Sequence, residues 1–462
     1  METGLRPGER SYTPARPRGR LPSRRLTAAG LWLVAVGNAV AIVWLWYHGG
    51  NVTGVHSTGA LLTSVGRITG LLGAYSALLQ VLLLARLPAL ERLVGFDRLN
   101  IWHRWNGHAC LYLILGHVGF SVVGYEKLDH FRLWKEISTM VWGGIYPGMI
   151  TATVGTFLLI VVVVSSIVVV RRRLNYEAWY FVHLTAYASI ALGWFHQIPT
   201  GNELVLDQVA ADYWRSLYAA TLFLLVLFCV GAPIMNTLRF RMRVAAVVSE
   251  GPGVVSLLIT GRRLDRLRPR PGQFFLWRFL SRRDWWKSHP FSLSAAPDGR
   301  SLRITVKDLG DFTSRIAQTP VGTRVVAEGP LGVFTDAARR REKVLLIGGG
   351  IGITPIRALL EQMEGDLVVV YRVLTEEDVI FRGELESLVA ERGIALHIVS
   401  GDHATDEGRG LLSPEHLCLL VPDIAEREVY LCGPPGMIAA IERNIRHTDV
   451  PSRYVHVERF AL

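Results

Sequence analysis

The chain has 462 residues, half of them hydrophobic, and a formal net charge of +11; its positive mean hydropathy is unusual for a wholly soluble protein and indicates a membrane part. Charge alone would allow a nucleic-acid binder, but the basic residues cluster at the ends of apolar runs, which is a topology signal of membrane proteins. The four cysteines form no C-x-x-C pair, so the sequence shows no disulfide framework, zinc site or iron–sulfur signature.

A six-span transmembrane domain is predicted over residues 27–236, after a basic tail at 1–26 that is expected to be disordered. Each of six apolar runs has close to the roughly 20 residues that a membrane-crossing helix needs. Backbone groups cannot stay unpaired in lipid, so each run is predicted to be a helix. The first run is too long for a signal-peptide core and is expected to remain as a span. The runs are 27–47, 59–85, 103–124, 147–170, 178–197 and 212–235.

Arginines mark alternate ends of these runs, which sets the expected orientation. They occur in the tail, between the second and third runs, after the fourth and after the sixth. This pattern predicts a multi-pass protein of the cell membrane with both termini and the whole soluble half in the cytoplasm. The arginines are Arg16, Arg18, Arg20, Arg24, Arg25, Arg86, Arg92, Arg98, Arg171, Arg172, Arg173, Arg239 and Arg241.

Two of the predicted spans carry a pair of histidines each. His103 and His117 lie on the third span, and His183 and His196 lie on the fifth. Both spans run in the same direction, so His103 and His183 match in depth near the inner face, and His117 and His196 near the outer face. Ionisable groups inside a membrane are costly and usually functional. We therefore predict two haems, each bound by one histidine from each span and about 20 Å apart along the helices.

Other readings of these polar residues stay open. A single membrane histidine is as easily a hydrogen-bonded core residue, and His108 is interpreted in that way. The 13 steps from His183 to His196 miss a common helix face by about 140°, so the fifth span is expected to tilt, bend or carry a wider turn. Arg67, near the outer end of the second span, either reaches the membrane surface or pairs with a haem propionate.

The composition changes near residue 237, where short alternating strands with Gly and Pro turns begin. Strands such as Arg239–Val248, Val254–Thr260 and Leu302–Lys307 predict an antiparallel β-barrel over 237–337. From 338 to 462 the pattern is strand, turn and helix in repetition, which predicts an α/β domain with a buried parallel sheet. Its expected strands are Val344–Ile347, Leu367–Tyr371, Leu396–Ser400, Glu428–Leu431 and the terminal run from Val455.

Two short motifs in the barrel are candidates for a flavin site. The first is His289-Pro290-Phe291-Ser292-Leu293-Ser294, a strand that could lay its backbone and Ser292 against a flavin ring. The second is Gly310-Asp311-Phe312-Thr313-Ser314, where a glycine opening a helix would leave N–H groups for a pyrophosphate. Either motif alone would be better explained as an ordinary barrel strand or turn.

The α/β part has two glycine-rich turns between a strand and a helix. The first follows VLLI and contains Gly348, Gly349, Gly350 and Gly352, with a helix beginning near Thr354; such glycines allow close approach of a dinucleotide phosphate. Pro355 occupies the third fingerprint site, so the match is imperfect. The second turn begins with Cys432, Gly433 and Pro434.

Arg372 follows the second strand of this part, 22 positions after Gly350. An arginine there can contact a 2′-phosphate, which predicts a preference for NADPH over NADH. The alternative is a solvated surface arginine.

The soluble half resembles the ferredoxin–NADP reductase fold: HPFSLS and GDFTS match its FAD motifs, and GGGIGITP and CGPPGM match its nicotinamide-nucleotide motifs. Glu458 and Phe460 match its C-terminal catalytic motif, in which an aromatic covers the flavin ring. Joined to six spans with histidine pairs, residues 27–462 are similar to the ferric reductase and NADPH oxidase superfamily, in a bacterial single-chain form.

The resemblance implies that NADPH, or NADH, gives a hydride to FAD, and that single electrons then pass through two b-type haems to an acceptor outside. That acceptor is oxygen, giving superoxide, or a ferric chelate. Two histidines fill both axial positions of each iron, so the acceptor would react at the haem edge. Two other classes remain: a membrane-anchored flavin reductase without haem that serves a cytoplasmic partner, and a transporter or channel with a nucleotide-binding regulatory domain.

Overall fold

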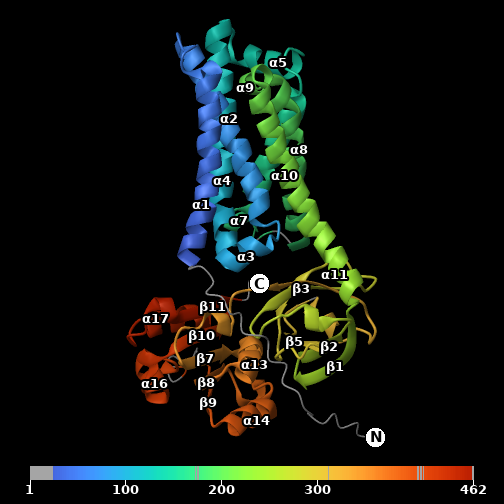
Figure 1. Ribbon diagram of the computed structural model, residues 1–462, viewed down its shortest axis with the longest axis vertical. Coiled ribbons are helices and arrows are strands. Elements are labelled where there is room, and N and C mark those ends of the chain that lie inside the picture. Colours follow the sequence, from blue (N-terminus) through green and yellow to red (C-terminus); the bar gives the residue numbers. More distant parts are fainter. Residues whose placement is uncertain are drawn as a thin grey trace. The chain divides into compact units, whose positions relative to one another are not determined.

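The structure is a computed structural model that describes residues 24–459, apart from residues 172, 174–175, 311, 403–404, 406–407 and 409. The chain divides into two compact units, one ending at Gly231 and the other beginning at Ala232. The first unit is helical, and the second contains the described strands (Figure 1).

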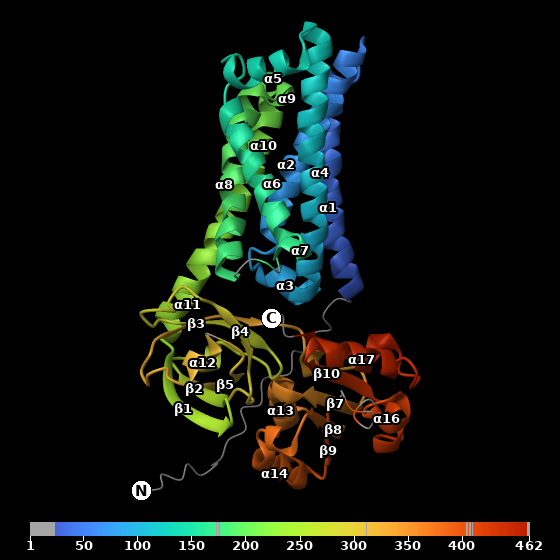
Figure 2. The same cartoon turned by 180° about the vertical axis from the view of Figure 1, so that it is seen from behind.

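The helical unit is built from long helices joined by short ones (Figure 2). Helix α2 packs along α4, and α6 packs along α8, as the two most extensive helix pairs. The long helices are α1 (Arg24–Trp46), α2 (Thr58–Leu83), α4 (Phe96–Asp129), α6 (Met149–Ser166), α8 (Tyr176–Thr200) and α10 (Gln208–Val226). The short ones are α3 (Pro88–Val94), α5 (Leu133–Trp142), α7 (Val168–Arg171) and α9 (Asn202–Leu206).

Polar residues and glycine set several helix ends in this unit. The Ser57 hydroxyl accepts the N–H of Ala60 at the start of α2, 3.1 Å away. Asp207 accepts the N–H of Val209 at the start of α10, 2.8 Å away. Gly95 separates α3 from α4. Its φ is +88°, a backbone conformation that residues with a side chain rarely adopt. Side-chain acceptors satisfy N–H groups that have no partner inside the helix.

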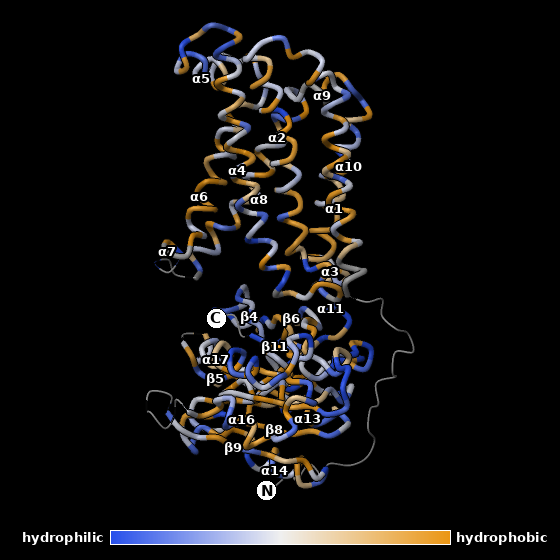
Figure 3. Tube along the Cα trace, turned by 90° about the vertical axis from the view of Figure 1, so that its left-hand side faces the viewer, coloured by the Kyte–Doolittle hydropathy of each residue, from blue (hydrophilic) through white to orange (hydrophobic). Residues whose placement is uncertain are grey.

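Among the residues that the structure describes, five helical segments are long and apolar enough to cross a membrane: Ala29–Asn51, Thr58–Leu83, Arg98–Asp129, Met149–Ser166 and Gln208–Phe240. Hydrophobic residues run along these helices in Figure 3. The predicted span 178–197 is a helix, α8, but it is not among the five. Its polar side chains, which include Glu177, His183 and His196, lower its hydropathy. The structure therefore supports several spans. The predicted fifth span, 178–197, rests on its helical form alone.

After α11 (Ala232–Phe240), two three-stranded antiparallel sheets share one hydrophobic core that includes Leu257, Trp277 and Ile304. An isolated bridge between Leu293 and Ile304 links the sheets. This is the antiparallel domain that the sequence predicts, and its closure into a barrel stays a prediction. The sheet orders are β1-β2-β5 and β4-β3-β6, with β1 (Arg243–Gly251), β2 (Val254–Thr260), β3 (Phe274–Phe279), β4 (His289–Ser292), β5 (Ser301–Lys307) and β6 (Val325–Leu331).

The last part of the chain is a five-stranded parallel sheet, as predicted, with the order β11-β10-β7-β8-β9. Hydrophobic clusters on its two faces pack it against α13 (Ile353–Gln362) and α14 (Arg382–Arg392) on one side and against α16 (Pro414–Leu420) and α17 (Pro435–Ile445) on the other. The strands are β7 (Lys343–Gly349), β8 (Asp366–Val373), β9 (Ala395–Ser400), β10 (Glu428–Gly433) and β11 (Val455–Arg459).

This strand order places a topological switch between β7 and β10. The chain proceeds from β7 through β8 to β9 on one side, and β10 then pairs with the other side of β7. In open α/β sheets, ligands bind beyond the carboxyl ends of the strands at such a point. Both predicted glycine-rich turns leave the sheet there.

Candidate functional site

The structure brings the four predicted span histidines together in two pairs. The ring centres of His103 on α4 and His183 on α8 lie 6.1 Å apart, with an angle of 51° between the ring planes. The ring centres of His117 and His196 also lie 6.1 Å apart, at 38°. The pairs match those expected from depth.

Helix α8 forms both pairs without a wider turn. It is an uninterrupted α-helix from Tyr176 to Thr200, so it presents His183 and His196 from sides about 140° apart. Of the three expected adjustments, the wider turn is therefore wrong, and the two rings reach their partners from different sides of the helix.

Each of the four rings has an oxygen acceptor at Nδ1. The partners of His103, His117 and His196 are the backbone carbonyl oxygens of Gln80 at 3.1 Å, Gly66 at 2.7 Å and Gly193 at 2.8 Å. A carbonyl can only accept, so these Nδ1 atoms carry the proton. Each Nε2 is then the atom with a lone pair for a metal, which is the arrangement that outer-shell partners impose on metal-binding histidines.

His183 reaches the same state through a hydroxyl. Its Nδ1 lies 3.3 Å from the Oγ atom of Ser166. That hydroxyl donates to the carbonyl of Val162 at 2.7 Å. Its single hydrogen is therefore used, and it accepts from Nδ1 of His183.

Glycines on α2 fix the position of His117. Gly66 supplies the carbonyl acceptor, and a Cβ atom on Gly70 would lie 2.6 Å from Nδ1 of His117. Gly73, one turn further on, would meet Ile114 of α4 at 2.7 Å. Small residues at helix interfaces in membranes allow this close approach. The sequence interpretation missed these residues, although glycines at positions 59, 66 and 73 repeat at a helical spacing that could have revealed them.

Arg67 donates to the side-chain oxygen of Asn51 at 2.9 Å, and Asn51 is buried. The residue follows Gly66 directly, so it lies at the level of the His117 pair. The membrane-surface role and the propionate role of Arg67 both stay predictions. His108 bonds the Arg104 carbonyl of its own helix at 2.8 Å, as a structural histidine would, but it is exposed and is not the core residue expected.

The two predicted flavin motifs lie against each other. The ring of His289 on β4 stacks on that of Phe312, with centres 3.7 Å apart and planes at 16°. The ring of Phe291, two residues further along β4, is nearly parallel to that of His289, and the two ring centres lie 6.3 Å apart. Pro290 is exposed and Ser292 is buried. Residues 23 positions apart in the chain therefore meet, and the two flavin motifs form one site.

The glycine turn of the second motif is held by its own side chains. The Oγ1 atom of Thr313 accepts the N–H of Leu309 at 2.8 Å and donates to the carbonyl of Gly310 at 3.0 Å. Gly310 has a φ of +154°, and a Cβ atom there would meet nothing within 4 Å. The expected helix is the single turn α12 (Thr313–Ile316), too short to supply a helix N-terminus for a pyrophosphate. Asp311 lies outside the described residues.

The two nucleotide turns pack glycine against glycine at the switch point. A Cβ atom on Gly349 would lie 2.2 Å from the sulfur of Met437, and one on Gly352 would lie 2.4 Å from the Cys432 carbonyl. A Cβ atom on Gly433 would lie 3.2 Å from the Cα atom of Gly349. Gly350 differs: it has a φ of +50°, and a Cβ atom there would meet nothing. Its open position is the one that suits a phosphate.

The remaining residues of these turns are structural supports. Gly348 packs against Ile353 at the start of α13. Thr354 is buried and donates to the Ile351 carbonyl at 3.0 Å, and Pro355 follows it inside the helix. Pro434 is the extended residue that precedes α17.

Glu458 lies on β11 directly opposite Cys432 on β10. Both are buried, and burial raises the pKa of the Cys432 thiol well above its usual value. Glu458 therefore lies at the carboxyl edge of the sheet, beside the second nucleotide turn. Phe460 lies outside the described residues.

Arg372 does not have the geometry expected of a phosphate reader. It is buried, and its guanidinium donates to the carbonyl oxygens of Val373, of Val399 at 3.3 Å and of Gly401 at 2.6 Å. Burial lowers its pKa. Because Arg372 is buried, it is not a solvated surface arginine either. It instead holds the ends of β8 and β9 together. A phosphate contact would have to replace these bonds.

Carboxylates lie nearer the nucleotide turn. Glu377 and Asp378, just after β8, line a hollow of about 170 Å³ together with Gly350 and Ile351. The backbone N–H of Glu377 and the Thr375 hydroxyl hold the pKa of the Glu377 carboxyl below its usual value, so it is charged at neutral pH. Asp378 lies 3.7 Å from Lys307.

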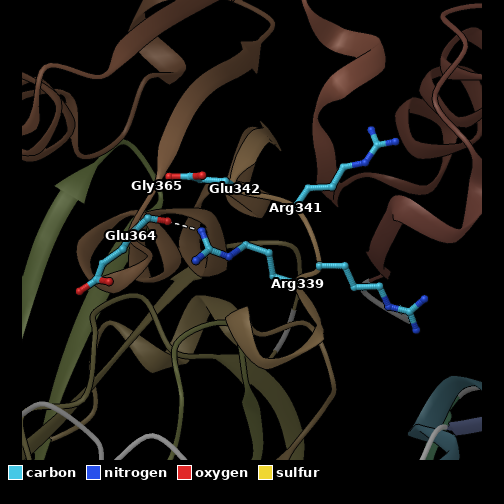
Figure 4. Close-up of a pocket in the computed structure, with 6 residues that line it drawn as sticks. Arg339, Arg341, Glu342, Glu364 and Gly365 are labelled. Atoms are coloured by element: carbon cyan, nitrogen blue, oxygen red, sulfur yellow. Dashed lines mark hydrogen bonds between the residues drawn. The ribbon is translucent and has the colours of Figure 1, made fainter. Parts of the chain in front are cut away.

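A second hollow, of about 430 Å³, lies at the opposite, amino-terminal edge of the sheet (Figure 4). Arg339 donates to the Glu364 carbonyl across it, and Arg341 points away and donates to the Ala425 carbonyl. These arginines connect the segment before β7 to neighbouring loops, and none of the predicted motifs reaches this edge.

Three family matches cover most of the described chain. Residues 69–194 match "Ferric reductase like transmembrane component", residues 239–335 match "FAD-binding domain", and residues 346–443 match "Oxidoreductase NAD-binding domain". The first match contains His103, His117 and His183 and ends two residues before His196, and the other two contain the flavin motifs and both nucleotide turns.

Characterised relatives match the soluble half. The ferredoxin reductase component of 3-ketosteroid-9-alpha-monooxygenase from Mycolicibacterium smegmatis is 33% identical over 48% of this chain and 65% of its own length. The glycine betaine monooxygenase reductase subunit from Chromohalobacter salexigens is 32% identical over 37% and 50%. The NADH-cytochrome b5 reductase 2 from Aspergillus terreus is 26% identical over 45% and 65%. The chain thus spans between half and two thirds of these relatives.

These matches agree with the fold of each part and with the sequence resemblance. The soluble half is an NAD(P)H oxidoreductase module with FAD- and NAD-binding domains. A ferric-reductase-like transmembrane domain precedes it in one chain. The protein therefore has the domain architecture of the ferric reductase and NADPH oxidase superfamily.

Proposed function

We propose that this protein carries electrons from a nicotinamide nucleotide in the cytoplasm, through FAD and two b-type haems, to an acceptor on the outer side of the membrane. The observation that carries the proposal is the pairing of His103 with His183 and of His117 with His196, each with 6.1 Å between ring centres.

The ring separation suits two histidines that would hold one iron between them. An imidazole bonded to a metal at about 2 Å has its ring centre roughly 3 Å from the metal, so two such rings are about 6 Å apart. The protonated Nδ1 of each ring leaves Nε2 for the metal. Hydrogen-bonded core histidines would need neither the matched pairs nor a common tautomer.

In the soluble half, the protein's residues would bind and orient the nucleotide and the flavin. The stacked rings of His289 and Phe312 and the buried Ser292 give the flavin site its shape. The open Gly350 receives the nucleotide phosphates at the switch point. FAD, when bound, accepts a hydride and releases single electrons, which is the chemistry that a haem chain requires.

The nucleotide is proposed to be NADH, in contrast to the NADPH expected from Arg372. Arg372 uses its guanidinium on carbonyls, whereas Glu377 and Asp378 line the hollow beside Gly350. An acid near this point bonds ribose hydroxyls and repels a 2′-phosphate. The charge beside the turn therefore favours the nucleotide without that phosphate.

The proposed location is the cell membrane, with the soluble half in the cytoplasm, as the arginine pattern predicts. Proteolysis of inside-out vesicles should release the chain after about residue 237, and right-side-out vesicles should protect it. Release from right-side-out vesicles alone would reverse the proposed direction of electron flow.

The acceptor is proposed to be a small molecule, either oxygen or a ferric chelate. Two histidines would hold each iron, so the acceptor would take electrons at a haem edge. No nucleic acid is involved in this function. A protein that binds FAD and no haem would instead be the membrane-anchored flavin reductase.

The deciding experiment is a reduced-minus-oxidised absorbance spectrum of the full chain purified in detergent, with haem quantified per chain. Two b-type haems per chain are expected, reducible by NADH in the absence of oxygen. A purified, FAD-loaded chain without haem would overturn the proposal in favour of the flavin reductase.

A further inference from the structure

The flavin-binding and nucleotide-binding domains meet in a network of two arginines and two glutamates. Arg303 on β5 of the flavin domain forms two bonds with Glu384 on α14 of the nucleotide domain, both 2.8 Å long. The same carboxylate lies 2.7 Å from Nε of Arg357 on α13. Glu384 thus bridges one arginine from each domain.

Arg357 continues the network along α13. Its Nη1 atom lies 2.6 Å from an oxygen of Glu361, one helical turn further on. That glutamate oxygen accepts the backbone N–H of Ala296 in the flavin domain at 2.7 Å. Arg357 is buried, so its charge depends on these carboxylates for compensation.

Both arginines also donate to one carbonyl oxygen, that of Ser294. Arg303 reaches it at 3.0 Å and Arg357 at 3.1 Å. Ser294 is fully buried and ends the HPFSLS motif, two residues after Ser292. Arg357 lies one turn after Thr354, on the helix that the glycine-rich turn opens. The network therefore joins the flavin motif to the nucleotide helix through a single backbone atom.

We propose that Glu384, held by Arg303 and Arg357, is a positioning residue that fixes the nucleotide domain against the flavin domain at the separation needed for hydride transfer. The inference rests on the proposed reduction of FAD by a nicotinamide nucleotide. Hydride transfer requires reacting atoms about 3–3.5 Å apart, and a misplacement of about 1 Å can cost a hundredfold in rate. A fixed, charge-assisted contact beside both motifs meets that requirement.

The network is more specific than a general domain contact. A bidentate carboxylate pair fixes orientation as well as distance, because the planar guanidinium of Arg303 must face both oxygens of Glu384. The Cζ atom of Arg303 also lies 4.9 Å from the ring centre of Phe381, the residue that precedes α14. Loss of the Glu384 charge would leave two arginines close together, and their repulsion would favour an altered domain angle.

The test uses the full chain in detergent and measures single-turnover reduction of bound FAD by saturating NADH, without oxygen. Glu384→Gln should slow flavin reduction about tenfold to a hundredfold, while the FAD content and the KM for NADH change less than threefold. A larger primary isotope effect with NADH deuterated at the transferred position is expected, because misplacement makes the chemical step slower.

Glu386→Gln is the matched control. Glu386 lies two residues further along α14, exposed, with only a 3.8 Å contact to Arg382, and its variant should reduce FAD at the wild-type rate. Arg303→Lys is the second variant: it keeps the charge but loses the paired N–H geometry, and it should fall between wild type and Glu384→Gln.

Three outcomes are informative. FAD-loaded Glu384→Gln that reduces flavin at the wild-type rate overturns the inference. Loss of FAD from both Glu384→Gln and Arg303→Lys also overturns it, because the network would then hold the fold together and would not position the nucleotide. A wild-type protein whose FAD is not reduced by NADH or NADPH would instead refute the proposed function, independently of the network.

Discussion

His117 on α4 and His196 on α8 face each other with ring centres 6.1 Å apart, and each donates its Nδ1 proton to a backbone carbonyl. The two acceptors come from different helices: Gly66 belongs to α2, whereas Gly193 belongs to α8 itself. Three helices thus determine the orientation of this one pair.

Replacing either histidine of this pair should remove one haem and leave flavin reduction intact. His117→Ala or His196→Ala loses one of the two proposed ligands, so about half of the haem per chain should disappear. Flavin reduction by NADH depends on residues of the other unit and should be unchanged. His108→Ala is the control, since its ring bonds only its own helix. Two haems retained in both variants would show that the ligands are wrongly assigned.

Gly70 is not a proposed haem ligand, but its replacement should affect the haem of the outer pair nearly as much as replacement of a histidine. Gly70→Ala adds a Cβ atom that would lie 2.6 Å from Nδ1 of His117, so the ring or the helix must move. We expect loss or a shifted spectrum of the haem of the outer pair, measured at low temperature. Gly119→Ala on α4, where a Cβ atom meets nothing within 4 Å, should leave the spectrum unchanged. Equal spectra for the two variants would place His117 outside the haem site.

Much of this site could be predicted because the chemistry repeats along the chain. His103 and His183 are visible as ionisable groups in apolar runs. Short alternating strands indicate the flavin domain, and the repeated pattern of strand, turn and helix indicates the nucleotide domain. The acceptors at Nδ1 could not be predicted in the same way, because Gln80 and Gly66 act through carbonyls that every residue possesses. Their selection depends on helix packing, which the local sequence does not encode.

Arg372 shows the limit of position-based reasoning in the soluble half. The sequence places Arg372 just beyond the second strand, but β8 extends to Val373 and includes Arg372, and the neighbouring strand end supplies the carbonyls of Val399 and Gly401. The Arg303–Glu384 pair was missed for a related reason: 81 residues separate its members, and no local pattern marks them.

The ion pairs of Glu384 with Arg303 and Arg357 should persist at mildly acidic pH. Burial alone would raise the pKa of the Glu384 carboxyl, but Arg303 and Arg357 outweigh burial and hold this pKa below its usual 4.5. A carboxyl with a depressed folded-state pKa contributes stability that is present above the unfolded value and is lost as the pH falls through the folded value.

The difference in Tm between wild type and Glu384→Gln, followed by flavin fluorescence, should therefore be constant from pH 8 to about 5 and shrink only below about 4.5. Glu386→Gln should show little difference from wild type across that range. A wild-type advantage that disappears already near neutral pH would mean that Glu384 is not held by the two arginines.

The choice of nucleotide provides the sharpest contrast between the sequence expectation and the structure. If Glu377 faces the ribose beside Gly350, wild type should use NADH with a higher kcat/KM than NADPH. Repulsion between the solvent-exposed carboxylate and a 2′-phosphate should lower kcat/KM for NADPH by about fivefold. Glu377→Gln should therefore improve NADPH by about that factor. Lys307 partly balances Asp378, which makes Glu377 the better position to change.

Glu376→Gln is the matched control, because the neighbouring Glu376 pairs with Arg382 and does not line the hollow. Arg372→Ala separates the two readings. As a phosphate reader, Arg372 would affect NADPH alone; as the residue that joins the ends of β8 and β9, it should lower kcat/KM for both nucleotides in the same proportion. A wild-type preference for NADPH, together with a selective loss of NADPH use in Arg372→Ala, would restore the phosphate contact and remove Glu377 from the nucleotide site.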